Sequence, residues 1–321
     1  MTAPKPRAQF DLFIPLMRDL PLKDQRETME RPFFSLQKRK RLKPIEYQSA
    51  DGEVRVKVEA VPAYGMATIW DGDILIWAAS ALNRLRAEGR NDIPRELKTT
   101  AYDLLRSIQR DTGGKGYVEL KAALDRLATT TIFTSIRAKR GRDSRFSWLD
   151  EWSVEVDPVT DKPIALKIVL SNWVYEGIIN EKSVLTMHPD YFQLSGGLER
   201  ALYRIARKHA GDQEQGWTCR VSLLHEKSGS DSAPKEFSRM LRKIVENNEL
   251  PEYDLAFTTA GDNSPAVHFI RRSAAERAEI RAEMEAEAEK RARRTREDLR
   301  AAEVDGLAEP FADRRVTWAR R

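Results

Sequence analysis

The segment Ser232–Asn248 separates apolar and basic side chains onto opposite sides of one predicted helix. At 3.6 residues per turn, its apolar stripe consists of Phe237, Leu241, Ile244 and Val245. The other side carries four cations, Lys235, Arg239, Arg242 and Lys243. Such a helix can pack on a core and still offer a basic face to a polyanion. An amphipathic helix whose basic face is merely solvated gives the same pattern.

The flanking segments favour a winged helix-turn-helix. A short helix is expected over 219–227, followed by a Gly-Ser turn, and strands are expected over 253–259 and 266–271. Helix, turn, basic helix and two-stranded wing is the order of that motif, whose second helix enters the DNA major groove. We therefore predict that the helix over 235–249 reads bases, because its two arginines suit bidentate contact with guanine.

Basic residues are clustered in this chain rather than abundant. The 321 residues include 55 Lys and Arg against 50 Asp and Glu, a net charge of +5 that would attract a polyanion only weakly. Two clusters are predicted to contact phosphates or the minor groove, at Lys38, Arg39, Lys40 and Arg41 and at Lys139, Arg140 and Arg142. A solvated arm and a solvated turn are the alternatives.

Composition also indicates the compartment. The single cysteine, Cys219, excludes an internal disulfide and suits a reducing environment. No apolar run approaches the ~20 residues of a membrane span, and the N-terminus lacks the regions of a signal peptide. The sequence predicts a cytoplasmic protein with no membrane contact.

The first half of the chain repeats the order of helices followed by a β-wing. Three helices are expected, beginning at Asp73, at Thr99 or Thr100, and at Tyr117. A hairpin is then expected to pair 132–138 with 146–156 around the second basic cluster. The helix from Tyr117 to Thr130 is less basic, with Lys121 and Arg126 as its candidate DNA contacts. A dimer interface or a structural role is left open for it.

The fold class expected from these patterns is α+β, with two tandem winged helix-turn-helix domains. These domains would occupy 46–186 and 187–272, after a flexible, largely disordered basic N-terminal arm over 1–45. The second domain would include a helix from Leu198 to His209. Its outward-facing residues are expected to be Arg200, Arg204, Arg207 and Lys208. A charged helix and a loose tail would follow over 273–321.

No catalytic constellation emerges from the spacing of reactive residues. Asp111 to Tyr117 has the flavour of a phosphate-binding loop but lacks the glycine and hydroxyl spacing that such a loop needs. The four histidines are scattered, with no pair suited to a catalytic metal. We therefore expect no enzyme activity, no metal and no cofactor. A nicking enzyme is disfavoured for the same reason.

Several short motifs, in order, resemble the plasmid replication initiator protein A family, the RepA-type initiators of proteobacterial plasmids. The residues that carry the resemblance are Arg31–Arg41, Pro44–Tyr47, Gly72–Trp77, Leu224–Ser230 and the helix over 235–250. The resemblance covers roughly residues 30 to 272. It implies binding of origin repeats through paired winged-helix domains and recruitment of host replication proteins.

The function predicted from these observations is sequence-specific binding of double-stranded DNA at plasmid origin repeats. Phosphate contacts from the arm and wing would fix the register, while the helix over 235–249 reads bases. Binding alone would then favour local opening of adjacent DNA, without chemistry by the protein. The alternative is a winged-helix transcription repressor that binds an operator as a dimer. Whether this chain forms a homodimer is left open.

Overall fold

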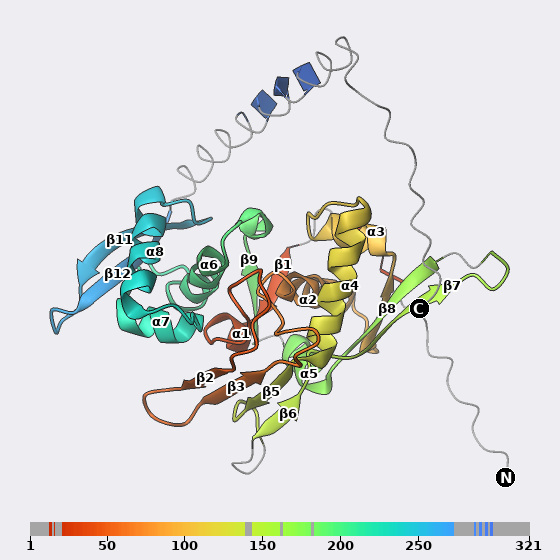
Figure 1. Cartoon of the computed structure of the whole chain (residues 1–321), viewed down its shortest axis with the longest axis horizontal. Helices are drawn as coiled ribbons and strands as arrows, with labels where there is room; N and C mark the ends of the chain where they lie inside the picture. Colours follow the sequence, from red (N-terminus) through yellow and green to blue (C-terminus); the bar gives the residue numbers. More distant parts are fainter. Residues whose placement is uncertain are drawn as a thin grey trace. The chain divides into compact units, whose positions relative to one another are not determined.

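The computed structural model describes residues 13–14, 16, 21–138, 143–160, 163–180 and 183–272, with single helical positions between 286 and 297 (Figure 1). Met1–Arg271 forms one compact body, and Arg272–Arg321 forms another. In the latter, residues 286, 289–290, 293–294 and 296–297 are helical, and Arg293 pairs with Glu297 at 2.9 Å. The rest of the predicted charged helix and tail lies outside the described residues.

A first winged-helix unit begins with a long buried helix. It consists of α2 (Gly72–Ala87), β4 (Glu96–Thr99), α3 (Ala101–Ser107), α4 (Gly114–Thr129), β7 (Leu149–Val156) and β8 (Pro163–Leu170). The strands form an antiparallel sheet in the order β4-β8-β7, so the short strand after α2 pairs with the last strand. Thr100 caps α3 by accepting a hydrogen bond from the Asp103 backbone N–H at 2.9 Å.

A second unit repeats this topology. It consists of α6 (Gly197–His209), β10 (Trp217–Arg220), α7 (Val221–Ser228), α8 (Pro234–Asn247), β11 (Tyr253–Thr259) and β12 (Pro265–Arg271). The sheet order is β10-β12-β11, which again pairs the short first strand with the last strand. Helix, strand, two helices and a hairpin therefore occur twice in the same order and pairing. The helix expected over 219–227 begins two residues later, at Val221, because Cys219 and Arg220 belong to the strand β10.

An additional four-stranded sheet interrupts the first unit. Its order is β2 (Ile45–Gln48), β3 (Arg55–Glu59), β5 (Thr131–Thr134) and β6 (Ser144–Phe146). The predicted hairpin is correct only for β5 and β6, because β7 pairs with β8 instead. Trp148, fully buried, separates β6 from β7 and ends the first pairing. The described strands on either side of the predicted basic cluster, β5 and β6, therefore belong to this additional sheet and not to the wing of the first unit.

The expectation of a largely disordered arm through residue 45 is wrong for residues 21–45. Strand β1 (Leu22–Gln25) pairs with β9 (Val184–Met187) and leads into the short helix α1 (Arg26–Met29). Phe33 and Phe34 are then 1% and 4% exposed. The Phe34 ring stacks on Trp148 with centroids 4.7 Å apart, and Phe33 lies 6.0 Å from Trp173, which belongs to α5 (Asn172–Ile179). The two adjacent phenylalanines were the feature of the sequence that could have indicated a buried segment. The prolines and cations around them made this segment look disordered.

Buried ion pairs connect α6 to the N-terminal half of the chain. Arg200 Nη1 lies 2.7 Å from Asp73 Oδ1 at the start of α2, and Arg204 Nη2 lies 2.7 Å from Asp24 Oδ2. Both arginines were expected to face solvent, and both are 3% exposed. The helical pattern was read as amphipathic because their carboxylate partners lie far away in sequence. A cation can be buried only where such partners meet it.

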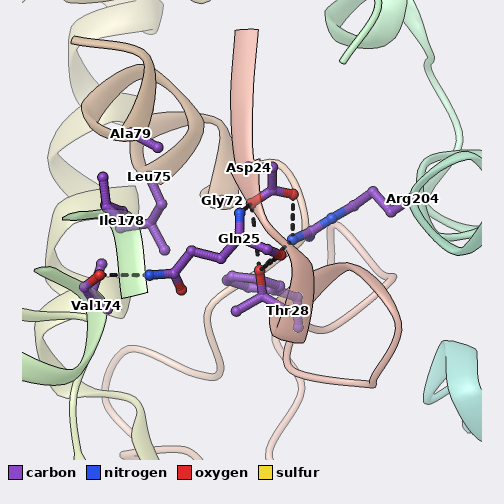
Figure 2. A pocket seen from close by; sticks show the side chains of 10 residues that line it. Asp24, Gln25, Thr28, Gly72, Leu75, Ala79, Val174, Ile178 and Arg204 are labelled. Atoms are coloured by element: carbon purple, nitrogen blue, oxygen red, sulfur yellow. Dashed lines mark hydrogen bonds and ion pairs between the residues drawn. The ribbon is translucent and has the colours of Figure 1, made fainter. Parts of the chain in front are cut away.

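A small cavity adjoins the Asp24–Arg204 pair (Figure 2). It is lined by residues of β1, α1, α2, α5 and α6. Within it, Gln25 donates from Nε2 to the Val174 carbonyl at 2.5 Å, and Thr28 Oγ1 accepts from Arg204 Nη2 at 3.0 Å. Most of these polar groups pair with one another, as expected for a structural junction, but the buried Nε of Arg204 has no hydrogen-bond partner among the described residues.

The folded arm leads to a test of stability. Phe34→Ala should lower the free energy of unfolding by about 3–5 kcal/mol, because it removes a buried ring and leaves a cavity beside Trp148. Chemical denaturation followed by tryptophan fluorescence measures this change. Phe13→Ala, at a side chain that is 48% exposed, is the control and should change stability little. An equally small change for Phe34→Ala would show that the arm does not contribute to the core.

Candidate nucleic-acid interface

Helix α8 has the two faces that the sequence predicted. Phe237, Leu241 and Ile244 are buried, and Val245 packs partly against the core. The four predicted cations, Lys235, Arg239, Arg242 and Lys243, are all exposed. Proline at the first helical position starts the helix, and Asn248, with a φ of 53°, ends it in the left-handed region. The basic face of α8 is therefore available to a ligand.

The arginines of this face are held differently. Arg239 donates from Nε and Nη2 to the two carboxylate oxygens of Glu236, at 2.9 and 2.6 Å. These hydrogen bonds raise the pKa of Arg239 and lower that of Glu236. The Arg242 guanidinium lies over the Phe257 ring of β11, 5.1 Å from its centroid. An exposed ion pair is worth about 0–1 kcal/mol, so Arg239 can exchange Glu236 for a base edge at little cost.

The start of α8 presents backbone donors. Its N-cap is Ala233, which has no side chain to cap the helix, and the first intrahelical bond is donated by Phe237 to the Ala233 carbonyl at 2.9 Å. The N–H groups of Lys235 and Glu236 precede that bond and so have no partner within the helix. Such groups bind phosphate well, and here they adjoin the exposed Lys235.

Residues Gln37–Lys43, which we call the strap, lie against the turn between α7 and α8. Arg41 donates from Nη1 to the Gly229 carbonyl at 2.7 Å and from Nε to the Lys43 carbonyl at 3.1 Å. Gln37 donates from its side-chain amide to Asp231. The first predicted basic cluster therefore contacts the turn that leads into the predicted recognition helix, although about 190 positions separate them. Nothing in the sequence pattern indicates this approach.

The four predicted contacts in this cluster have different roles. Arg41 is 6% exposed, and burial lowers its pKa, so its side chain supports the turn rather than reaching DNA. Lys40 donates from Nζ to the Ala63 carbonyl at 2.7 Å and the Pro62 carbonyl at 3.3 Å. Lys38 lies over the Trp70 ring at 5.2 Å, and Arg39 donates to Gln37 at 2.6 Å. Lys38 and Arg39 remain exposed at the surface.

Helix α4 offers less to DNA than α8. Arg126, a predicted contact, donates from Nε and Nη2 to both oxygens of Asp71 at 2.7 and 2.8 Å, and Asp71 is 1% exposed. Burial opposes this charge, but the hydrogen bonds to Asp71 raise the pKa of Arg126. Arg126 is therefore a structural residue, and the prediction that it contacts DNA is corrected. Lys121 is exposed on the same helix.

The predicted wing contacts cannot be placed on a wing. Lys139, Arg140 and Arg142 lie outside the described residues. The wing of the first unit, formed by β7 and β8, carries Glu151 and Glu155, which pair with Lys167 and Lys98 at 2.8 Å each. The described charges of β7 and β8 are therefore mainly acidic, with Asp150, Glu151 and Glu155 against Lys167, unlike those of α8.

Most of the chain matches one known protein family. Residues 23–255 match the family described as Replication initiator protein A. The chain belongs to this family. Its resemblance to replication initiators, inferred from short motifs, is thereby confirmed. A "Putative replication protein" of Wigglesworthia glossinidia brevipalpis is 32% identical over 239 residues, which are 73% of this chain and 84% of that protein.

Solved structures share the fold of this family member. Two crystal structures of domains 2 and 3 of RctB are similar, each with 12% sequence identity. The first covers 75% of this chain and 95% of the RctB chain with a TM-score of 0.53; the second covers 77% and 97% with a TM-score of 0.50. The likeness supports a mixed α+β fold.

Within the described part of the chain, no group of three or more His, Cys, Asp or Glu side chains is arranged to hold a metal ion. Among the helices that the structure describes, none combines the length and hydropathy needed to cross a membrane.

The contrast between Arg126 and Lys121 gives a second prediction. Arg126→Ala should destabilise the fold by about 3 kcal/mol, because it leaves the buried Asp71 carboxylate with one partner fewer. Lys121→Ala should change stability by less than about 0.5 kcal/mol, as expected for an exposed residue. Thermal unfolding of both variants measures this difference. Near-equal stabilities would contradict the structural role assigned to Arg126.

Proposed function

We propose that this chain is a sequence-specific double-stranded DNA-binding protein that initiates plasmid replication at origin repeats. The observation that carries the proposal is the exposed basic face of α8, whose opposite face is buried in the core. The strap contacts the turn that precedes this helix. In this reading Arg239 and Arg242 contact base edges, and Lys235 and Lys243 contact phosphates. Membership of the initiator family supports the same function.

The proposed mechanism uses both winged-helix regions, residues 46–186 and 187–272. Two such regions on one face of a duplex reach major grooves about 34 Å apart. Exposed strap cations, Lys38 and Arg39, would add phosphate contacts that fix the register without reading sequence. Binding energy would then bend adjacent DNA and favour opening at easily unstacked steps. Host replication proteins would complete the opening, and the chain itself would perform no chemistry.

The base-reading role of α8 has a matched control. Arg239→Ala and Arg242→Ala should each weaken binding to cognate repeats by about 1–3 kcal/mol and reduce the ratio of cognate to scrambled affinity. Arg84→Ala is the control, because Arg84 is also exposed and pairs with a carboxylate of its own helix, Glu88, at 2.7 Å. It should leave both affinities unchanged. Fluorescence anisotropy with both duplexes gives the ratio directly.

An unchanged ratio in both α8 variants would place base recognition elsewhere in the chain. Initiation is tested separately from binding. The gene with its adjacent repeats should sustain a plasmid in a host that lacks it, and the Arg242→Ala gene should not. Binding without plasmid maintenance by the unaltered gene would favour the transcription repressor instead.

A further inference from the structure

Three exposed apolar side chains belong to the strap and to the turn that it contacts. Leu42, Val61 and Tyr64 are 50%, 39% and 45% exposed. They come from the strap and from the turn Val61–Gly65, which the strap contacts. We call these three residues the apolar tip. Large apolar groups gathered at one exposed position indicate a contact surface more strongly than single exposed residues do.

The turn that carries the tip is held rigidly. The N–H groups of Gly65 and Tyr64 both donate to the Val61 carbonyl, at 2.8 and 3.1 Å. Gly65 has a φ of 84°, and the aliphatic stem of Lys40 packs against its Cα, where a side chain would overlap it. The Lys40 ammonium also donates hydrogen bonds to the carbonyls of Pro62 and Ala63. The Lys40 side chain therefore stabilises the turn that carries the tip and is not assigned a phosphate contact.

The backbone beside the tip is hydrogen-bonded to segments that adjoin α8 and α4. On one side, Arg41 of the strap bonds the α7–α8 turn at Gly229, while its carbonyl accepts from the Met66 N–H at 3.0 Å. On the other side, the Ala67 N–H donates to Thr130 Oγ1, at the end of α4, at 2.8 Å. The tip therefore belongs to a short connection that joins the turn between α7 and α8 to Thr130, which follows α4.

The exposed charges of the strap are all positive, and the glutamates nearest the tip in sequence, Glu46 and Glu59, both pair with Lys57, at 3.9 and 2.7 Å. Lys38, Arg39 and Lys43 are exposed within four positions of Leu42. An apolar wedge bordered by cations is the device by which proteins enter the minor groove, where phosphates of both strands lie close to the inserted side chain. A protein partner with an apolar surface would not need this border of cations. Charge complementarity therefore favours DNA as the occupant.

We propose that the apolar tip inserts into the minor groove between the two major grooves that α4 and α8 face, and partly unstacks one base step. This proposal rests on the proposed function. Two major-groove sites on one face of a duplex have a minor groove between them, and the tip connects the two helices that would occupy those sites. Tyr64 supplies a ring that can lie against a base, and Leu42 and Val61 supply the apolar wedge. The inserted tip would bend the origin repeat.

The test uses the full chain on its cognate repeat. The double variant Leu42→Ala with Tyr64→Ala alters only exposed side chains, and Val154→Ala, 42% exposed on β7, is the matched control. Fluorescence energy transfer between the duplex ends reports the bend, which wedge insertion sets at about 20–90°. The double variant should reduce the bend by at least about half, and the control should not.

A second readout measures unstacking itself. A mismatch placed between the two major-groove sites is already partly unstacked, so the unaltered protein should bind it about tenfold more tightly than the matched repeat. The double variant should lose that preference while keeping the cognate-to-scrambled ratio. An unchanged bend and an unchanged mismatch preference would overturn the proposal. If the double variant keeps the bend and the mismatch preference but no longer sustains the plasmid, the tip would be assigned to a protein partner. Loss of specific binding in the unaltered protein would instead reject the proposed function.

Discussion

An ion pair buried between α2 and α6 is the constraint on which the arrangement of the two winged-helix units depends. Burial raises the pKa of Asp73, while the guanidinium groups of Arg200 and Arg110 lower it, and both arginines lie within 3.0 Å of its carboxylate. Neither Asp73 nor Arg200 can reach water, so separating them would leave two uncompensated charges, at several kcal/mol each. The first helix of each unit is therefore fixed against the other.

The candidate interface is built on that junction. Phe33 and Phe34 pack in the aromatic core. The strap that follows them is hydrogen-bonded to the turn between α7 and α8. Arg41 and Lys40 use their cations to hold carbonyls, which fixes the backbone and leaves Lys38, Arg39 and Lys43 at the surface. A basic cluster in the sequence thus divides into residues that position the surface and residues that can bind a polyanion.

Local pattern was enough to predict α8, the β11–β12 hairpin and the repeated winged-helix order, because each depends on periodicity within one segment. It failed wherever a distant partner decides the outcome. Arg126, Arg200 and Arg204 looked solvent-facing because Asp71, Asp73 and Asp24 lie far from them in sequence. The wing of the first unit was misassigned because β8, and not β5, pairs with β7. No periodicity could bring the strap to the α7–α8 turn.

The buried ion pair leads to the proposal that the two winged-helix units bind DNA as one rigid body. Inserting base pairs between the two halves of a cognate repeat tests it directly, with affinity measured for insertions of about 5 and about 10 base pairs, half a turn and one turn. A rigid body cannot stretch to either site, so both insertions should reduce affinity to that of a single half-site. Full affinity restored by the one-turn insertion would show that the units move independently, and would contradict the account.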